Sequence, residues 1–301
     1  MKYLILFFFL GITLQAHSNE CNSEKNSISK IARSIQNKMS QGSSEKYLEA
    51  LKAQGFSCED ENKESASHCF GCLPPSKKSK NLCLPSEPYS RLVHIFIPMN
   101  FDSKKPMSLT YHFHGWNQSA NDNPFNLKVG NFGKYLQDSG KNSILIVPES
   151  YGKNEDHKRL NSPEKIDNFM KSISDSLKSA GIPYDQNTPV NLTGHSGAYS
   201  HLSKWASFKK NEQIQYLKNL NGVALLDSLY SYKPAFVDWN PKKTLIIFNP
   251  TQDADKNIAN KLLYKNLCPN PPCENVQITT DSKTQHVDFV NKYMTQVLSE
   301  F

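Results

Sequence analysis

The sequence has few long apolar runs and no blocks of like charge. Beyond the run Leu4–Leu14, no segment is long and apolar enough to span a bilayer, so we expect no stable membrane anchor in the mature protein. The net charge is +7, but the lysines are scattered and no segment resembles a nucleic-acid-binding module. Internal repeats and long low-complexity tracts are also missing. These absences favour a globular protein with a solvated surface, and they leave open an attraction to an anionic envelope or polymer.

The first residues have the features of a secretory signal. Lys2 precedes the apolar run Leu4–Leu14, which is too short for a membrane span, and small residues follow it. The residues before Cys21 do not form a lipobox. We therefore expect residues 1–18 to be a signal peptide and the mature protein to be secreted or periplasmic.

Seven cysteines follow this segment, and in an exported protein they favour disulfide bonds. Two of them enclose the short proline-rich loop Cys268-Pro-Asn-Pro-Pro-Cys273, which a disulfide would close. Four others have a mirror-like spacing that allows several pairings or, alternatively, a zinc site: Cys58, Cys69, Cys72 and Cys83. Because seven is odd, one cysteine, such as Cys21, has no partner within the chain.

Residues 19–88 are expected to form a small helical, Cys-rich appendage on the main domain. Their apolar residues recur at helical spacing in two places, which predicts two short amphipathic helices followed by a cysteine-rich loop. The residues concerned are Ile28, Ile31, Ile35 and Met39 in the first helix, and Tyr47, Leu48 and Leu51 in the second.

Residues 89–301 alternate short apolar strands with helical stretches. This alternation predicts an α/β domain with a mostly parallel central sheet and helices on both faces, and ligands then bind beyond the carboxyl ends of the strands. The expected strands are 91–97, 108–113, 144–147, 190–193, 223–226, 244–248 and 276–279. The expected helices are 127–138, 166–180, 198–208, 212–217, 255–267 and 287–298.

The segment Gly194-His195-Ser196-Gly197-Ala198 lies between an expected strand and an expected helix. A serine on such a tight turn is forced to stand clear of the backbone, and small flanking residues are needed because strand and helix pass close together. Ala198 occupies the place where the usual pattern has a glycine. The plain alternative is a serine that merely caps the helix.

Two further segments match the same architecture. Tyr111-His112-Phe113-His114-Gly115-Trp116 follows an early strand, and Gln285-His286-Val287-Asp288-Phe289 follows the last one. With the serine turn and the order of elements, residues 89–301 resemble the α/β-hydrolase superfamily. The resemblance implies an α/β-hydrolase fold and acyl transfer through a serine, without a metal or other cofactor.

The resemblance also assigns roles to residues. Ser196 is the expected nucleophile and His286 the histidine that activates it, because superfamily members carry this histidine after the last strand. The backbone N–H groups of Gly197 and of Gly115 or Trp116 are expected to form the oxyanion hole. His114 and Tyr230 are expected to contact the substrate.

The acidic member of the triad has two candidates. Asp227 directly ends an apolar run, where its neighbours would hold the carboxylate firmly, and Asp253 follows the next strand. Hydrolases of this fold use either place, and Asp255 is a further alternative. The acid would fix the imidazole tautomer and stabilise its protonated form.

The sequence thus predicts a secreted serine esterase whose substrate is a small-molecule or polysaccharide ester. A polar segment at 117–126 favours a polar ester such as an acylated carbohydrate or cell-wall polymer, whereas six aromatic residues near the expected mouth suit sugars and acyl chains alike or belong to the core. They are Trp116, Phe125, Tyr151, Tyr199, Tyr230 and Trp239. A peptidase or amidase with the same triad, and an inactive hydrolase fold that binds a partner, are the alternatives. The oligomeric state is left open.

Overall fold

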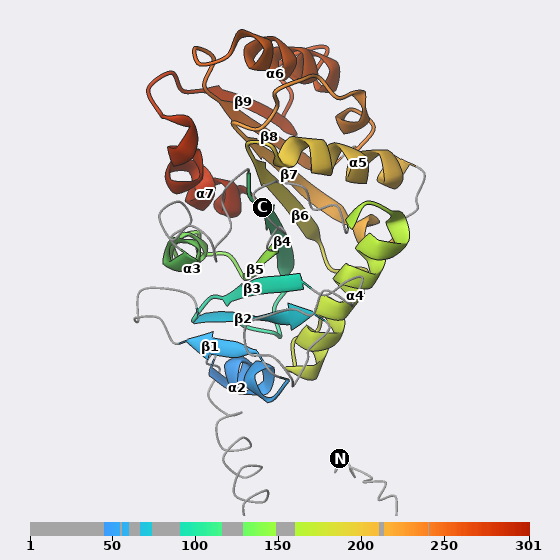
Figure 1. Ribbon diagram of the computed structural model, residues 1–301, viewed down its shortest axis with the longest axis vertical. Coiled ribbons are helices and arrows are strands. Elements are labelled where there is room, and N and C mark those ends of the chain that lie inside the picture. Colours follow the sequence, from blue (N-terminus) through green and yellow to red (C-terminus); the bar gives the residue numbers. More distant parts are fainter. Residues whose placement is uncertain are drawn as a thin grey trace, which may run out of the picture. The chain divides into compact units, whose positions relative to one another are not determined.

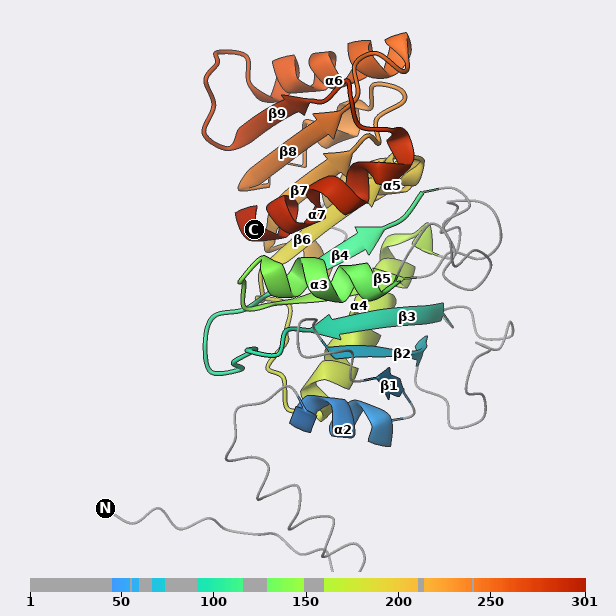
Figure 2. The same ribbon diagram turned by 90° about the vertical axis from the view of Figure 1, so that its left-hand side faces the viewer.

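Short segments of the chain, most of them apolar, form the strands of one sheet. Figures 1 and 2 show these strands side by side. The computed structural model describes residues 45–54, 56–59, 67–73, 91–115, 129–148, 160–210, 214–239 and 241–301, which all lie in one compact unit spanning residues 42–301. The signal segment, the first expected N-terminal helix, Cys21, Cys83 and Trp116 lie outside these residues.

The described part of the chain contributes nine strands to the sheet, in the order β1-β2-β3-β5-β4-β6-β7-β8-β9. The six strands β4 to β9 pair in parallel with one another. Strands β1, β2 and β3 extend this sheet beyond β5 through antiparallel pairs. The strands are β1 (Ser57–Glu59), β2 (Ser67–Leu73), β3 (Arg91–Ile97), β4 (Ser108–Phe113), β5 (Ser143–Pro148), β6 (Val190–His195), β7 (Leu220–Leu226), β8 (Lys243–Phe248) and β9 (Val276–Thr280).

Helices cover both faces of the sheet. Figure 2 shows α3 and α7 side by side on one face, and their apolar side chains share a core cluster with residues of β5, β7 and β8. Helices α2, α4, α5 and α6 pack into the larger cluster on the other face. The helices are α2 (Glu45–Ala53), α3 (Val129–Asp138), α4 (Pro163–Ser179), α5 (Ala198–Lys210), α6 (Ala254–Leu267) and α7 (Phe289–Glu300), with single 3₁₀ turns η2 (Gln215–Leu217), η3 (Pro234–Phe236) and η4 (His286–Asp288).

The expected strands and helices of the main domain are confirmed, with two local corrections. Of the segment 212–217, expected to be a helix, residues 214–217 are described, and they contain the single turn η2. The cysteine-rich segment, expected to be a loop, forms β1 and β2 instead. Pairing of β2 along the whole of β3 supplies backbone hydrogen bonds that override the loop-like local composition.

Two disulfides are formed in the described residues. Cys58 and Cys69 face each other across the β1–β2 pair and are bonded, which is not compatible with the zinc alternative for these two residues. Cys268 and Cys273 are bonded as expected and close the loop after α6. None of the helices in the described ranges is long and apolar enough to cross a membrane.

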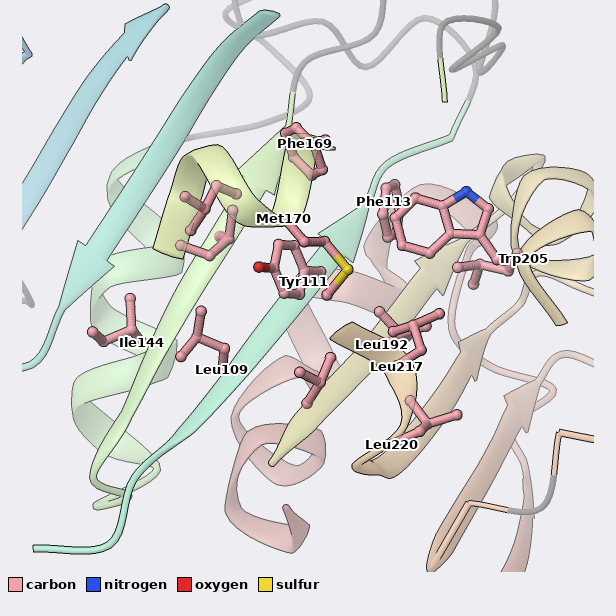
Figure 3. Packing of buried hydrophobic residues seen from close by; sticks show 14 of the residues in the cluster. Leu109, Tyr111, Phe113, Ile144, Phe169, Met170, Leu192, Trp205, Leu217 and Leu220 are labelled. Carbon is pink, nitrogen blue, oxygen red and sulfur yellow. The ribbon is translucent and has the colours of Figure 1, made fainter. Parts of the chain in front are cut away.

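The larger core holds together the strands that lead into the functional site. Figure 3 shows Tyr111 of β4 between the strands and α4, where its ring meets Phe169 edge-on. Trp205 of α5 is fully buried, packs edge-on against Phe113 at 5.0 Å, and donates its indole N–H to the Leu160 carbonyl at 3.2 Å. These contacts fix α5 against the end of β4.

Truncating this indole should therefore destabilise the whole domain. We expect Trp205→Ala to lower the free energy of unfolding by about 3–5 kcal/mol, since it leaves a large cavity and an unpaired buried carbonyl. Urea unfolding followed by circular dichroism measures the change. Leu262→Ala on α6 is the control because Leu262 is 38% exposed, and it should change the free energy by less than about 0.5 kcal/mol. Equal losses in the two variants would contradict this description of the core.

Candidate active site

Residues from four separate segments meet beyond the carboxyl ends of the parallel strands. Gly115 follows β4, Ser196 follows β6, Asp227 follows β7, and His286 begins η4 after β9. In a parallel sheet the carboxyl ends of neighbouring strands lie at one edge, so residues that are far apart in sequence converge there.

Ser196 stands on a strained turn between β6 and α5. Its φ is 54°, in the left-handed region that a residue with a side chain seldom adopts. The helix returns so closely that a Cβ on Gly194 would lie 2.5 Å from Leu202 Cδ1 and 3.3 Å from Ala198 Cβ. Because Gly194 has no Cβ, the methyl group of Ala198 is accommodated. The sequence departure at Ala198 therefore does not disturb the turn.

A chain of short hydrogen bonds joins Ser196, His286 and Asp227. The Ser196 hydroxyl lies 2.8 Å from His286 Nε2, and His286 Nδ1 lies 2.5 Å from Asp227 Oδ2. Ser196 is buried, with 9% of the residue exposed, whereas the His286 side chain is 29% exposed. The partly exposed imidazole therefore connects a fully buried carboxylate to the serine hydroxyl.

Three donors converge on the Asp227 carboxylate. Besides His286, the Asn249 backbone N–H donates to Oδ1 at 3.0 Å and Lys256 Nζ donates to Oδ2 at 2.9 Å. Burial raises the pKa of Asp227, but the hydrogen bonds from His286, Asn249 and Lys256 outweigh it and hold the pKa below its ordinary value. Asp227 is thus an anion at neutral pH.

The structure places the other candidate acid elsewhere. Asp253 is the N-cap of α6, where its Oδ1 accepts the Lys256 backbone N–H at 3.0 Å, and Asp255 lies exposed in the first turn of the same helix. The helix start satisfies Asp253 locally. Of the three carboxylates considered from the sequence, only Asp227 is hydrogen-bonded to His286 in the described residues.

Gly115 lies directly against the serine. A Cβ at this position would come within 2.4 Å of Ser196 Cβ and 3.0 Å of its Oγ, so a residue with a side chain does not fit. His114, expected to contact substrate, is fully buried, and its Nδ1 is hydrogen-bonded to the Gly115 carbonyl at 2.9 Å. Its burial points to a role in holding this turn. Of the other two residues expected to line the oxyanion hole, Gly197 directly follows Ser196 in the turn, whereas Trp116 lies outside the described residues.

The Tyr230 hydroxyl reaches both Ser196 and His286. It lies 3.3 Å from Ser196 Oγ and 3.1 Å from His286 Nε2. Burial raises the pKa of Tyr230, so the side chain is a neutral phenol at physiological pH. Its ring packs beside that of Tyr199, with 5.8 Å between centroids. Trp239, also expected near the mouth, is instead buried against Phe236 in the core.

No protein-family model matches the sequence, and no curated protein matches it. Among solved structures, an S-formylglutathione hydrolase from Agrobacterium tumefaciens is similar to this chain, with a TM-score of 0.51 and 8% identity over 81% of this chain and 96% of that one. The feruloyl esterase module of Clostridium thermocellum, solved with sinapinate, gives a TM-score of 0.52 and 12% identity over 80% and 90%.

The chain has the α/β-hydrolase fold. At these identities the likeness concerns the fold alone, and it assigns no role to a residue of this chain.

Two side chains of this α/β-hydrolase site were not singled out in the sequence. His195 donates its Nε2–H to the His286 carbonyl at 2.9 Å and stacks on the His286 ring at 4.7 Å. Burial, together with the neighbouring His286, lowers the pKa of His195 to about 3, so it stays neutral. Lys256 was missed because a lysine in the first turn of a helix gives no sign of being buried. The described residues contain no group of three or more His, Cys, Asp or Glu side chains arranged to hold a metal ion.

The anionic state of Asp227 should be visible in the pH dependence of stability. A depressed pKa contributes stability above the unfolded-state value of about 3.9, and the contribution disappears as the pH falls through the folded-state pKa. Asp227→Asn should cost about 3 kcal/mol or more at pH 7, because it leaves the buried Lys256 ammonium unpaired. The gap to wild type should begin to narrow below about pH 4, where the aspartate of the unfolded wild type takes up a proton, and should close further as the pH falls toward the lower folded-state pKa of Asp227.

Urea unfolding between pH 7 and pH 3.5 measures this gap. Ser228→Ala serves as the control, since it removes a neutral hydrogen bond from Ser228 Oγ to the Ser196 carbonyl. Its cost should be the same at every pH. If the gap for Asp227→Asn were equally constant, Asp227 would not be the titrating group.

Proposed function

We propose that the protein is a serine hydrolase of carboxylic esters, with Ser196 as nucleophile, His286 as general base and acid, and Asp227 as the third member of the triad. The observation that carries the proposal is the hydrogen-bond chain from Ser196 Oγ through His286 to Asp227, at 2.8 and 2.5 Å, beneath a serine held at positive φ. A serine hydroxyl is a poor nucleophile by itself, and an adjacent oriented base is what activates it.

The geometry supports a two-stage reaction. His286 Nε2 accepts the Ser196 proton while Oγ attacks the ester carbonyl carbon, and a tetrahedral intermediate forms. His286 then gives this proton to the departing alcohol oxygen, and the ester bond breaks to leave an acyl-serine. Water repeats the cycle and releases the acid. Asp227 keeps Nδ1 protonated, so that Nε2 is the free base, and stabilises the transient imidazolium.

The oxyanion is assigned to backbone donors around Ser196. We propose the N–H groups of Gly197 and of Gly115 or Trp116, because fixed N–H dipoles need no reorganisation when negative charge develops. The close approach of Gly115 to Ser196 supports this assignment. The hydrogen bond from His114 to the Gly115 carbonyl gives the turn a fixed orientation.

Tyr230 is assigned to the leaving group. Its hydroxyl lies within hydrogen-bonding distance of both Nε2 and Oγ, so an alcohol oxygen that takes the proton from Nε2 comes close to it. As a neutral phenol it can donate a hydrogen bond from its O–H to this oxygen, while the proton itself comes from His286 Nε2.

The substrate is proposed to be a polar ester, such as an acylated carbohydrate or cell-wall polymer. The adjoining rings of Tyr199 and Tyr230 offer an aromatic surface beside Ser196, which suits a sugar or an aromatic acyl group. The structural neighbours include a feruloyl esterase module, whose name agrees with an ester substrate. The disulfides Cys58–Cys69 and Cys268–Cys273 agree with export by residues 1–18, followed by the appendage 19–88 and the catalytic domain 89–301.

The triad is tested at two of its members, Ser196 and Asp227, with Asp253 as the control. We expect Ser196→Ala to abolish both labelling by a fluorophosphonate and hydrolysis of p-nitrophenyl acetate. Asp227→Asn should lower kcat about 10³–10⁴-fold because the imidazole loses its tautomer and charge partner. Asp253→Asn removes only a helix cap and should change kcat by less than about 10-fold.

The outcomes separate the alternatives. A folded wild type that takes up no label would be the inactive, partner-binding form of the fold. Labelling that survives Ser196→Ala would move the nucleophile elsewhere. The substrate class is tested with p-nitrophenyl esters of rising chain length and with acetylated polysaccharides. Matching anilides compare ester with amide cleavage, and faster turnover of the anilides would favour an amidase.

Tyr230→Phe tests the leaving-group assignment. The loss should be about 10- to 100-fold in kcat/KM for an alkyl acetate, whose alkoxide needs a proton donor. It should be several-fold at most for p-nitrophenyl acetate, whose leaving group departs without protonation. Tyr199→Phe is the matched control, since it keeps the aromatic ring and should affect the two esters alike. An equal loss on both esters with Tyr230→Phe would mean that Tyr230 only shapes the site.

A further inference from the structure

Lys256 places a positive charge inside the site. Its Nζ lies 2.9 Å from Asp227 Oδ2, and the side chains are 3% and 0% exposed. The same oxygen accepts the His286 Nδ1–H at 2.5 Å. Ammonium and imidazole therefore share one carboxylate oxygen, and the mechanism proposed above makes no use of the ammonium.

The position of Lys256 is unfavourable by local rules. It lies in the first turn of α6, three residues after the N-cap Asp253, where the helix dipole disfavours a cation. Burial of an ammonium adds a desolvation cost that only a close partner offsets. Conflicts of this kind between local preference and structure concentrate at functional sites.

A second contact links Lys256 to the reacting atoms. Its Nζ lies 4.6 Å from the centre of the Tyr230 ring, and the Tyr230 hydroxyl bonds to Ser196 Oγ and His286 Nε2. The ammonium thus touches the carboxylate behind His286 and the phenol in front of it.

We propose that Lys256 is a positioning residue that fixes the Asp227 carboxylate toward His286 and lowers the pH at which His286 becomes a free base. The inference rests on the proposed triad. An Asp227 carboxylate paired with Lys256 offers less net negative charge to the imidazolium than an unpaired carboxylate would. The imidazolium is then less favoured, and His286 releases its proton at lower pH.

The other groups around His286 do not supply this effect. His195 of β6 is neutral and so is Tyr230, because burial lowers the pKa of the former to about 3 and raises that of the latter. Asp253 at the start of α6 lies close enough to act on Tyr230, and Asp288 follows in η4, but both are acidic and would act in the opposite direction. Among the described residues, Lys256 is the cation that bonds to the Asp227 carboxylate, which in turn is bonded to His286.

The test compares two lysines that are removed in the same way. In Lys256→Met the acidic limb of the pH profile of kcat/KM should move up by about one pH unit, with p-nitrophenyl acetate as substrate. Lys256→Arg, which keeps the charge, should leave the limb within about 0.3 unit of wild type. Lys243→Met removes a partly buried lysine that pairs with Glu300 on α7, and should not move the limb.

A second readout does not depend on turnover. The His286 Nδ1 proton, held in its short hydrogen bond to Asp227, gives a far-downfield proton resonance whose pH titration reports on the imidazole directly. Its midpoint should rise by about one unit in Lys256→Met. If wild type hydrolyses no ester, the proposed function fails while this titration still tests the effect of Lys256.

Two results would overturn the inference. One is a folded Lys256→Met in which stability and rate fall but the limb and the titration midpoint stay in place, which is a purely structural role. The other is a shift of about one unit in Lys256→Arg, which would assign the effect to shape. If Lys256→Met does not fold, Lys256→Gln and the arginine variant carry the same comparison.

Discussion

The site depends on one buried carboxylate and the donors it holds together. Asp227 sits at the end of β7 with φ of 43°, and it accepts hydrogen bonds from η4, from the residue after β8 and from α6. These donors belong to three different segments of the chain. A buried anion is stable only when its partners are in place, so the carboxylate ties the ends of β7, β8 and α6 to the histidine turn.

The same carboxylate also determines the charge of the site. With Lys256 bonded to it, the pair behind His286 carries no net charge, and protonating the imidazole adds a positive charge to a partly buried region. His286 keeps 29% of its side chain in solvent, which lowers the cost of that charge. Hydrogen bonds at both ring nitrogens hold His286 in place, which suits the general base proposed for it.

The sequence predicts those features that short-range physics determines. Apolar runs locate β3 to β9, most clearly in the parallel strands β4 to β8, which are buried because helices cover both faces of the sheet. Steric crowding at a strand–helix turn picks out Ser196, and the place of His286 after the last strand follows from the order of elements. The strands β1 and β2 were not predicted because the outer strands of a sheet are stabilised by their neighbours, here β2 for β1 and β3 for β2, and their own residues carry little of the pattern.

The choice between Asp227 and Asp253 shows why the rest is not local. Both residues follow a strand, and no pattern in the chain separates them. The difference arises in three dimensions: Asp253 satisfies its carboxylate at once by capping α6, and the helix it starts carries Lys256 back to Asp227. Asp253, which is not hydrogen-bonded to His286, thus helps to place Lys256 against Asp227, which is. A buried cation has no signature in one sequence, since its cost and its compensation lie on different segments.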